Sequence, residues 1–410
     1  MATSEWRPAK LDQLGHVGRG RSRHRPRNAD FLYGGPYPFF QTGDIKAANY
    51  YLNDYTQTYS EAGLAQSKLW QPGTLCITIA ANIAESAILG IEGCFPDSVV
   101  GFVVDPEKAD VRFVKYYLEI LKLRMQGISH GSTQDNLSMD KLLTFDFLVP
   151  PLPIQRRIAG ILSAYDDLIE NSQRRIKILE EMARRLYREW FVYFRFPGHE
   201  DCLLVDSPLG EIPEGWEVKP FSAIASYVNG YPFKPAELGP AGKPIIKIKE
   251  LKAGIVADTP RNIGDEIPGK YHIHDGDVLF SWSADLDAYL WMGGDGLLNQ
   301  HLFTVLPADT FSRAFCFHSL KGSMPRFRAL SLGATMHHIK RSALDQVFTV
   351  VAPAPMRNRF DVLVEPIHQQ LITISKQIQN LRHSRDLLLP RLLSGQIDVE
   401  ALPEPVLSES

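Results

Sequence analysis

Two stretches of the chain carry a repeating hydrophobic pattern that predicts long helices. In the first, apolar or small residues recur at alternating steps of three and four, at Ile158, Ile161, Tyr165, Ile169, Ser172, Ile176, Leu179, Ala183, Leu186 and Trp190. In the second, the same steps give Phe360, Leu363, Ile367, Leu371, Ile374, Ile378, Leu381, Arg385, Leu388 and Leu392. One stripe sustained over about four heptads is typical of a coiled-coil seam, so each helix is expected to be the other's partner.

Prolines mark where these helices begin. One proline cluster starts at Pro150 and another at Pro353, each just before a helical period. Pro366 lies early in the second helix. Because proline lacks the N–H that an inner turn needs, we expect the helix to kink or break there, so that its longest uninterrupted stretch begins near Ile367.

The remainder of the chain is duplicated. Strand-like alternating runs follow both Gly73 and Gly276, and Gly131 matches Gly333 at a distance of roughly 200 residues. The duplication predicts two similar mixed α/β (α+β) domains separated by two long antiparallel coiled-coil helices. The predicted parts are a first globular domain (1–150), a first helical region (151–196), a linker (197–215), a second globular domain (216–352), a second helical region (353–395) and a tail (396–410).

Composition limits the class of protein. The formal net charge is -3 and the pI is near 6.5, so any affinity for nucleic acid must come from local patches. The four cysteines are scattered without metal-ligand spacing, which favours reduced thiols in a cytosolic protein. No signal peptide opens the chain and no run of about 18 apolar residues occurs, so no membrane segment is expected.

Several motifs occur in an order that resembles a known family. They are QTGDI (Gln41 to Ile45), GSTQDNLS from Gly131, LVPPLPIQRRIAGIL from Leu148, LGEIPEGWEV from Leu209, and LLLPRLLSGQI near the end. Together with the duplication, they resemble the specificity subunits of Type I restriction-modification enzymes over nearly the whole chain. The family often has a Glu-Gln pair in the proline-led motif, where this chain has Ile154-Gln155 and Met356-Arg357.

The resemblance implies a DNA-binding subunit of a system for defence against foreign DNA. Two target-recognition domains would each read half of a bipartite, gapped site on double-stranded DNA, and the helices would set the gap. A helix from roughly Ala164 to Phe191 rises about 40 Å, close to the 34 to 36 Å of one turn of B-DNA.

The resemblance also implies that this chain is a non-catalytic, cytoplasmic subunit without a cofactor of its own. Adenine methylation and DNA cleavage would belong to modification subunits, expected in two copies, and to restriction/translocase subunits. S-adenosylmethionine, ATP and Mg are expected on those partners. Trp190, Phe191, Tyr193 and Phe194 would form an apolar end for a methyltransferase subunit to cover.

A row of alternating arginines is the strongest candidate for DNA contact. It comprises Arg19, Arg21, Arg23, Arg25 and Arg27, in a stretch that contains Gly and Pro. Guanidinium groups projecting from an extended loop suit phosphates and the O6 and N7 edge of guanine. The alternative is a solvated loop that meets an acidic protein partner. The counterpart segment 229–235 (NGYPFKP) is aromatic, so the two halves should read different sequences.

Polar loops and a lysine pair are further candidates for DNA contact. The two Gly-led loops contribute Ser132, Thr133 and Gln134 in the first half and Thr335, Met336, His337 and His338 in the second. Such side chains suit base edges, although Ser and Thr after Gly also cap turns. Lys247 and Lys249 alternate on a predicted strand and would meet phosphates; a merely exposed strand face is the alternative.

Enzyme classes find little support in the sequence. There is no GxxxxGK[ST] loop for a nucleotide, and Pro150-Pro151 lacks the polar and aromatic neighbours of an adenine methyltransferase motif. Glu250-Leu251-Lys252 has only part of a nuclease pattern, and His272 with His274 has no third metal ligand. The remaining alternative to a DNA-specificity subunit is a coiled-coil scaffold that touches no DNA.

Overall fold

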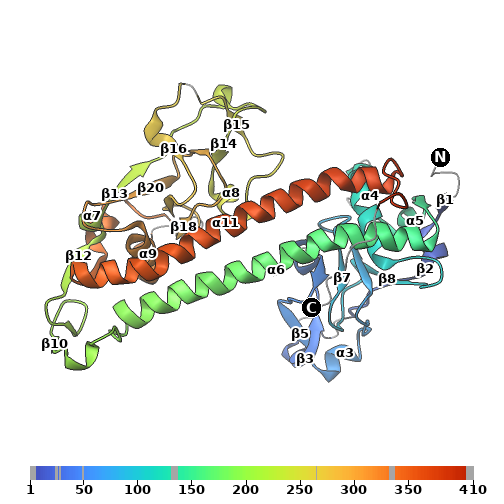
Figure 1. Ribbon diagram of the computed structural model, residues 1–410. Helices are drawn as coiled ribbons and strands as arrows, with labels where there is room; N and C mark the ends of the chain where they lie inside the picture. The colour runs from blue at the N-terminus through green and yellow to red at the C-terminus, as the bar shows by residue number, and fades with distance from the viewer. Residues whose placement is uncertain are drawn as a thin grey trace. The chain divides into compact units, whose positions relative to one another are not determined.

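The computed structural model describes residues 6–23, 26, 29–48, 50–130, 137–264, 266–331 and 338–402. The chain divides into two compact units (Figure 1). The first unit comprises Met1–Asn171 and Asn380–Ser410, and the second comprises Ser172–Gln379. Among the described residues, no helix combines the length and apolar character that a membrane span requires.

A five-stranded sheet forms the centre of the first unit. Its order is β2 (Gly15–Arg19), β8 (Val99–Val104), β6 (Leu75–Thr78), β7 (Ser86–Leu89) and β4 (Tyr51–Leu52). All neighbours are antiparallel except β4 and β7. Helix α4 (Val111–His130) shares the main core with the sheet, because Phe113 and Val114 pack with Leu75 and Phe102.

Short elements complete the first unit. Strand β1 (Arg7–Ala9) pairs with β9 (Phe147–Val149), and β3 (Tyr33–Phe39) pairs with β5 (Gln57–Tyr59). The short helices are α1 (Leu11–Leu14), α2 (Thr42–Ala47), α3 (Glu61–Leu64) and α5 (Met139–Leu142).

The second unit repeats this plan. Its main sheet has the order β13 (Ala225–Asn229), β20 (Leu302–Pro307), β17 (Val278–Ser281) and β18 (Asp287–Leu290), and α9 (Arg313–Ala329) packs against it. A second sheet has the order β15 (Arg261–Asn262), β14 (Lys243–Ile246), β19 (Gly296–Leu298) and β16 (His272–Ile273). The predicted mixed α/β fold is therefore confirmed.

Shorter pairs and helices surround these sheets in the second unit. Strand β12 (Glu217–Pro220) pairs with β21 (Phe348–Val351), and β10 (Leu204–Val205) pairs with β11 (Ile212–Pro213). The short helices are α7 (Phe221–Ile224), α8 (Ile248–Ala253) and α10 (Ala343–Gln346).

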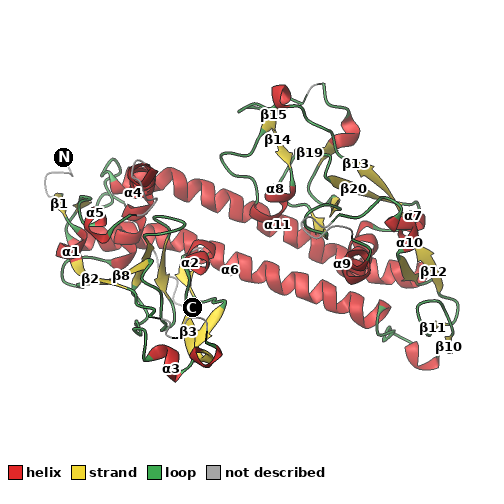
Figure 2. Ribbon diagram, turned by 180° about the vertical axis from the view of Figure 1, so that it is seen from behind, coloured by secondary structure: helices red, strands yellow, loops and turns green. Residues whose placement is uncertain are grey.

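Two helices of 40 residues each, α6 (Leu152–Phe191) and α11 (Ala354–Leu393), contribute a segment to each unit. In the first unit, Ile158 near the start of α6 lies in one core with Leu392 near the end of α11. In the second unit, Phe191 at the end of α6 packs on Phe360 near the start of α11, with ring centroids 5.0 Å apart. The helix segments therefore run antiparallel within each unit, side by side in Figures 1 and 2.

The predicted stripe explains which side chains are covered. Of its 20 positions only Leu363 is exposed, at 48%; its neighbour Val364 is buried instead. The charged stripe position, Arg385, forms an ion pair with the buried carboxylate of Asp166, which also accepts a hydrogen bond from the hydroxyl of Tyr116. A charge at the seam is thus matched within the first unit.

The expected break at Pro366 is wrong. Helix α11 continues from Ala354 to Leu393 through this residue. Proline removes only one N–H, and the carbonyl that loses it belongs to Val362, which is 73% exposed and can be solvated. The seam residues on either side, Val364 and Leu371, are buried and hold the helix in place.

The expected apolar end at Trp190–Phe194 is also largely wrong. Trp190 and Phe191 are buried within the second unit itself, where Phe191 contacts the rings of Phe315 and Trp216. Val192, at 47%, and Tyr193, at 44%, are the exposed residues of this segment. The aromatic residues form a core of this unit, because the second globular domain folds back onto the helix end.

A buried side chain near the start of each long helix ties the helix to its globular domain. The Gln155 amide donates to the carbonyl oxygens of Lys108 (3.1 Å) and Pro150 (2.9 Å). Its own oxygen accepts from the Asp110 N–H at 3.1 Å. We call this the Gln155 clamp.

Arg357 makes the equivalent contacts in the second unit. Its guanidinium donates to the carbonyl oxygens of Ala352 (3.0 Å) and Thr310. These carbonyls occupy the same places in the repeat as those of Pro150 and Lys108. The guanidinium also lies 4.2 Å from the ring centroid of Phe311, which favours the larger cation there.

We predict that Gln155→Ala destabilises the chain by about 2 to 4 kcal/mol, because it leaves buried polar groups of Lys108, Asp110 and Pro150 without partners. The free energy of unfolding in urea measures this. Arg175→Ala, an exposed change on the same helix, is the matched control and should stay within about 0.5 kcal/mol of wild type. A Gln155→Ala variant as stable as this control would contradict the clamp.

Candidate nucleic-acid interface

One edge of the main sheet of the first unit gathers several of the predicted contact residues. Strand pairing places Arg19 of β2 beside Val100, Val100 beside Ile77 of β6, and Ile77 beside Ser86 of β7. With neighbouring strands about 4.8 Å apart, Arg19 lies about 10 Å from the end of β6. We call this end of the strands, from Arg19 through Val100 and Ile77 to Ser86, the reading edge.

The turn that follows β2 is held tightly against the next strand. Gly20 donates to the carbonyl of Val99 at 2.8 Å, and Arg21 donates to the carbonyl of Phe95 at 3.0 Å. A Cβ at Gly20 would clash with the carbonyl oxygen of Pro96. Glycine is therefore required here for the close approach of two backbones.

The described arginines of the predicted row are exposed. Arg19, Arg21 and Arg23 all have exposed side chains, and the Nε of Arg19 donates to the carbonyl oxygen of Asp97. Arg19 ends a strand, so the row begins on the sheet and continues into the turn. Arg25 and Arg27 lie outside the described residues.

The β6–β7 turn at the same edge has an unusual backbone. Ala81, Asn82 and Ala84 have φ values of 44°, 43° and 63°, a region that non-glycine residues rarely adopt. Contacts from other elements hold it: Lys46 Nζ donates to Asn82 Oδ1 (3.1 Å), and Gln126 donates to the carbonyl of Ile83 (3.1 Å). Such strained turns are concentrated at functional sites.

The first Gly-led loop rejoins the sheet at this turn. Leu137 donates to the carbonyl of Ile79 at 2.8 Å. Ser132, Thr133 and Gln134 lie outside the described residues, so the structure fixes the end of their loop and not their side chains.

The second unit has the same edge with different side chains. Strand pairing places Asn229 beside Phe303, Phe303 beside Phe280, and Phe280 beside Ala288. Gly230 donates to the carbonyl of Leu302 at 3.0 Å, and a Cβ on it would clash with the Asn299 carbonyl. Asn229 is therefore the structural counterpart of Arg19.

The aromatic counterpart of the arginine row packs on itself. Tyr231 replaces Arg21, and its N–H donates to the carbonyl of Leu298 at 2.7 Å. Its ring lies 4.9 Å from that of Phe233 and 5.4 Å from that of Tyr271. This segment of the second unit therefore presents apolar rings where the first unit presents cations.

The second Gly-led loop rejoins its sheet in the same way. Ile339 donates to the carbonyl of Trp282 at 3.1 Å, and His338, which is exposed, is bridged to Ser283. Exposed Gln300 and His301 precede β20 at this edge. Thr335, Met336 and His337 lie outside the described residues.

Sequence analysis did not single out Asp97, Gln300 or His301. They precede the strand that pairs with β2 or β13, so only the pairing brings them to the edge. The signal that could have found them is the repeat itself, because Asp97 and Gln300 occupy matching places before Val99 and Leu302.

Comparisons with known proteins agree with this duplicated architecture. Residues 3–181 match the family described as the Type I restriction modification DNA specificity domain. The chain is similar to specificity subunits of Type I restriction-modification enzymes over most of its length. The resemblance predicted from the motifs is confirmed.

Relatives match over nearly the full chain. The specificity subunit of the Type I restriction enzyme MjaIX of Methanocaldococcus jannaschii is 25% identical over 424 residues, covering 97% of this chain and 95% of the relative. That of HindI of Haemophilus influenzae is 22% identical over 470 residues, covering 96% and 100%. The fold resembles that of an S subunit from M. genitalium, with a TM-score of 0.57, 15% identity and coverage of 94% and 96%.

The strand predicted at Lys247 and Lys249 is wrong. Strand β14 ends at Ile246, and helix α8 begins at Ile248. The helix starts there because the buried carboxylate of Glu250 accepts the Lys247 N–H at 3.1 Å, which caps the first turn. Lys249 is paired with Asp258 at 2.7 Å. The two lysines therefore do not alternate on a strand face, and their contact with phosphate stays a prediction.

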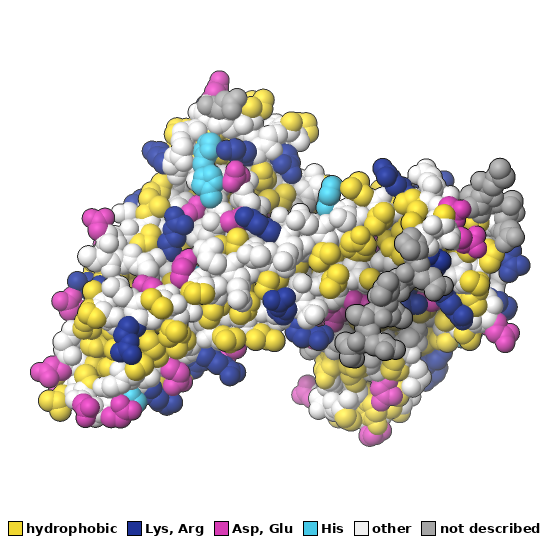
Figure 3. Space-filling model, in the orientation of Figure 1, with side chains coloured by type: hydrophobic (Ala, Val, Ile, Leu, Met, Phe, Trp, Pro, Cys, Tyr) yellow, Lys and Arg dark blue, Asp and Glu magenta, His cyan; other side chains and the backbone are white. Residues whose placement is uncertain are grey.

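Among the described residues, the charged side chains and histidines form no other obvious site. On the face shown in Figure 3, Lys and Arg side chains are spread among acidic and apolar ones in both units. His272 contacts Lys243 and the carbonyl of Ile267, whereas His274 contacts Asp295. The two rings thus serve separate partners, and the described residues contain no cluster with the ligands for a metal ion.

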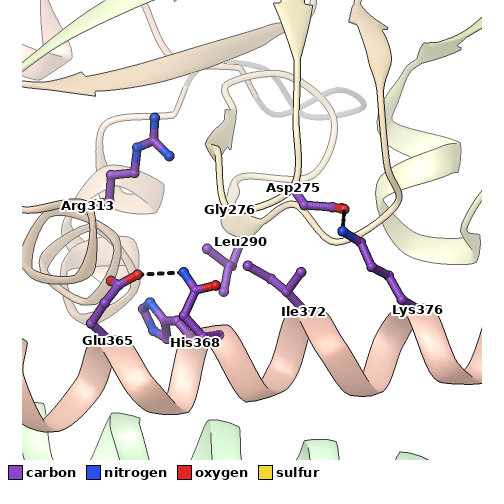
Figure 4. Close-up of a pocket in the computed structure, with 9 residues that line it drawn as sticks. Asp275, Gly276, Leu290, Arg313, Glu365, His368, Ile372 and Lys376 are labelled. Atoms are coloured by element: carbon purple, nitrogen blue, oxygen red, sulfur yellow. Dashed lines mark hydrogen bonds and ion pairs between the residues drawn. The ribbon is translucent and has the colours of Figure 1, made fainter.

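A polar pocket of about 190 Å³ lies where the second unit's sheet meets α11 (Figure 4). Figure 4 shows Ile372 and Lys376 rising from α11 toward the turn at Asp275 and Gly276. Lys376 pairs with Asp275 at 2.9 Å. Lys376 and Asp275 thus attach the sheet turn to the helix.

Two histidines are buried beside this pocket. The Nε2 atoms of His318 on α9 and His368 on α11 lie 3.2 Å apart, and the ring of Tyr187 stacks on His318 at 5.9 Å. Burial lowers the pKa of His318 to about 3, and His368 and Lys321 act in the same direction. Burial also lowers the pKa of His368, opposed by Glu365. The pair is therefore neutral when the chain is folded near pH 7.

We predict that this pair makes the chain less stable in mild acid. Both folded-state pKa values lie below the ordinary value of about 6.5, so the unfolded chain binds protons first as the pH falls. The stability is fully present above about pH 6.5 and declines below it, by up to about 1.4 kcal/mol per pH unit for each imidazole. Urea unfolding between pH 7.5 and pH 5 measures the decline.

The double variant His318→Gln/His368→Gln should show a shallower pH dependence whatever its absolute stability. His383→Gln, at an exposed position of α11, is the control and should keep the wild-type slope. An unchanged slope in the double variant would mean that other groups cause the acid sensitivity.

Proposed function

We propose that this chain is the non-catalytic DNA-specificity subunit of a Type I restriction-modification complex, and that it recognises a bipartite, gapped site on double-stranded DNA. Each unit would read one half of the site with its reading edge. The observation that carries the proposal is the pair of reading edges, which share one backbone plan but differ in side chains.

The exposed groups at these edges suit DNA. In the first unit the edge joins the arginine row to the end of the polar loop that contains Ser132 to Gln134. In the second unit, exposed Asn229, Gln300 and His301 lie at the edge. The distance of about 10 Å between Arg19 and the end of β6 is comparable to the major-groove width of about 12 Å, so side chains from both places could reach one groove.

The long helices would set the number of unread base pairs. Each globular domain is clamped to the start of one helix, by Gln155 or Arg357, and two antiparallel helices would make a stiff connection. A spacer of this kind makes the gap a fixed property of the chain.

The chemistry would belong to other chains of the complex. Modification subunits, in two copies, would methylate adenine with S-adenosylmethionine, and restriction/translocase subunits would use ATP and Mg to move along DNA and cut it. This chain would bring them to the site in the cytoplasm and bind no cofactor itself. The proposal is supported by the similarity of the chain to specificity subunits.

Selection of bound sequences tests this function. The chain, assembled with the modification subunits of its own host, is mixed with duplexes of random sequence, and methylated adenines are mapped in a genome with and without its gene. A consensus of two short blocks separated by a fixed gap is expected. A single continuous block, or no consensus, would overturn the proposal.

The alternative is a coiled-coil scaffold that touches no DNA, and the salt dependence of binding separates the two. If Arg21 and Arg23 contact phosphates, the double variant Arg21→Ala/Arg23→Ala should make the slope of log affinity against log salt shallower by about 1 to 2. Arg175→Ala/Lys177→Ala on α6 removes the same charge away from the edge and should not change the slope. Equal slopes for both variants would favour the scaffold.

A further inference from the structure

We propose that Arg19 and Asp97 in the first unit, and Asn229 and Gln300 in the second, determine specificity at equivalent places of the two half-sites. The first unit reads a G·C pair and the second reads an A·T pair. This inference rests on the proposed function, because it assigns bases to the reading edges.

The four residues form two structurally equivalent pairs. Arg19 and Asn229 are each the last residue of the outer strand and precede the glycine that closes on the neighbouring strand. Asp97 and Gln300 each lie two residues before the strand that pairs with the outer strand. In the first unit the Val99 N–H donates to the Pro96 carbonyl, and in the second unit the Leu302 N–H donates to the Asn299 carbonyl, at 3.0 Å in each case. The backbone thus presents both pairs alike, and only the side-chain chemistry differs.

The first pair has the chemistry of a G·C reader. The backbone carbonyl of Asp97 accepts from Arg19 Nε, which orients the guanidinium, and within the described residues its two terminal nitrogens have no other partner. Two parallel N–H donors match the O6 and N7 acceptors of guanine. The exposed carboxylate of Asp97 can accept from the N4 amino group of cytosine. A carboxylate would be repelled by phosphate, so its place at the edge favours a base.

The second pair has the chemistry of an A·T reader. Asn229 and Gln300 are exposed, and neither side-chain amide bonds to another described residue. Their backbones are fixed, since Asn229 pairs with Phe303 and the Gln300 N–H donates to the Tyr231 carbonyl at 3.1 Å. An amide offers one donor and one acceptor side by side, which matches N6 and N7 of adenine. It lacks the two parallel donors that guanine requires.

An exchange of the pairs tests the inference. In the assembled methyltransferase complex, Asn229→Arg/Gln300→Asp should change one position of the second half-site from A·T to G·C and leave the first half-site unchanged. The probe is a duplex library that keeps one wild-type half-site and randomises the other. Ser226→Arg, which adds an arginine near the other end of the same strand, is the control and should leave the consensus unchanged.

Single truncations keep the test decisive if the exchanged variant does not fold. Asn229→Ala and Gln300→Ala should each reduce discrimination at one position of the second half-site by roughly 5- to 100-fold. Arg19→Ala should do so in the first half-site. A gapped consensus that is unchanged in all these folded variants would overturn the assignment and leave the specificity function standing, whereas a wild-type chain without a gapped consensus would overturn both.

Discussion

The structure depends on a buried side chain that fastens each globular domain to the start of a long helix. Gln155 and Arg357 differ in size and charge, yet both donate to carbonyls at the same two places in the repeat. A buried carbonyl without a donor costs about as much as a lost hydrogen bond, so the helix start cannot turn away from its domain cheaply. The position of each domain on its helix is therefore determined by satisfied backbone groups as well as by apolar packing.

The two units share the backbone of the reading edge but differ in the side chains on it. The glycines that follow β2 and β13 are required by close backbone contact, and the strand pairing beneath them is shared. The side chains of Arg19 and Asn229 are exposed and take no part in this close backbone contact. Substitutions at such exposed positions cost little stability, which under the proposed function would allow one fold to serve many target sequences.

The sequence predicted what depends on local period and could not predict what depends on pairing. The stripe from Ile158 to Leu392 identified the covered faces because burial repeats with the helical turn. The predicted break failed at Pro366, where packing on both sides outweighs one lost hydrogen bond. The predicted strand failed at Lys247, where the cap provided by Glu250 outweighs an alternating pattern. The reading edges combine residues far apart in sequence, such as Arg19 and Asp97, and no local period records that contact.

Buried polar groups show how such a structure can be specific without being maximally stable. The pair of Asp166 and Arg385 occupies a seam where an apolar pair would cost less desolvation, and the neutral pair of His318 and His368 interrupts an aromatic core. A shift of α6 along α11 by one turn would leave the charge of Asp166 buried without Arg385, and a shift of α9 along α11 would leave a ring nitrogen of His368 without His318. An apolar seam tolerates such a shift, whereas these groups penalise it. For a chain whose helices would have to hold two readers at a constant spacing, a unique register is worth more than the stability it costs.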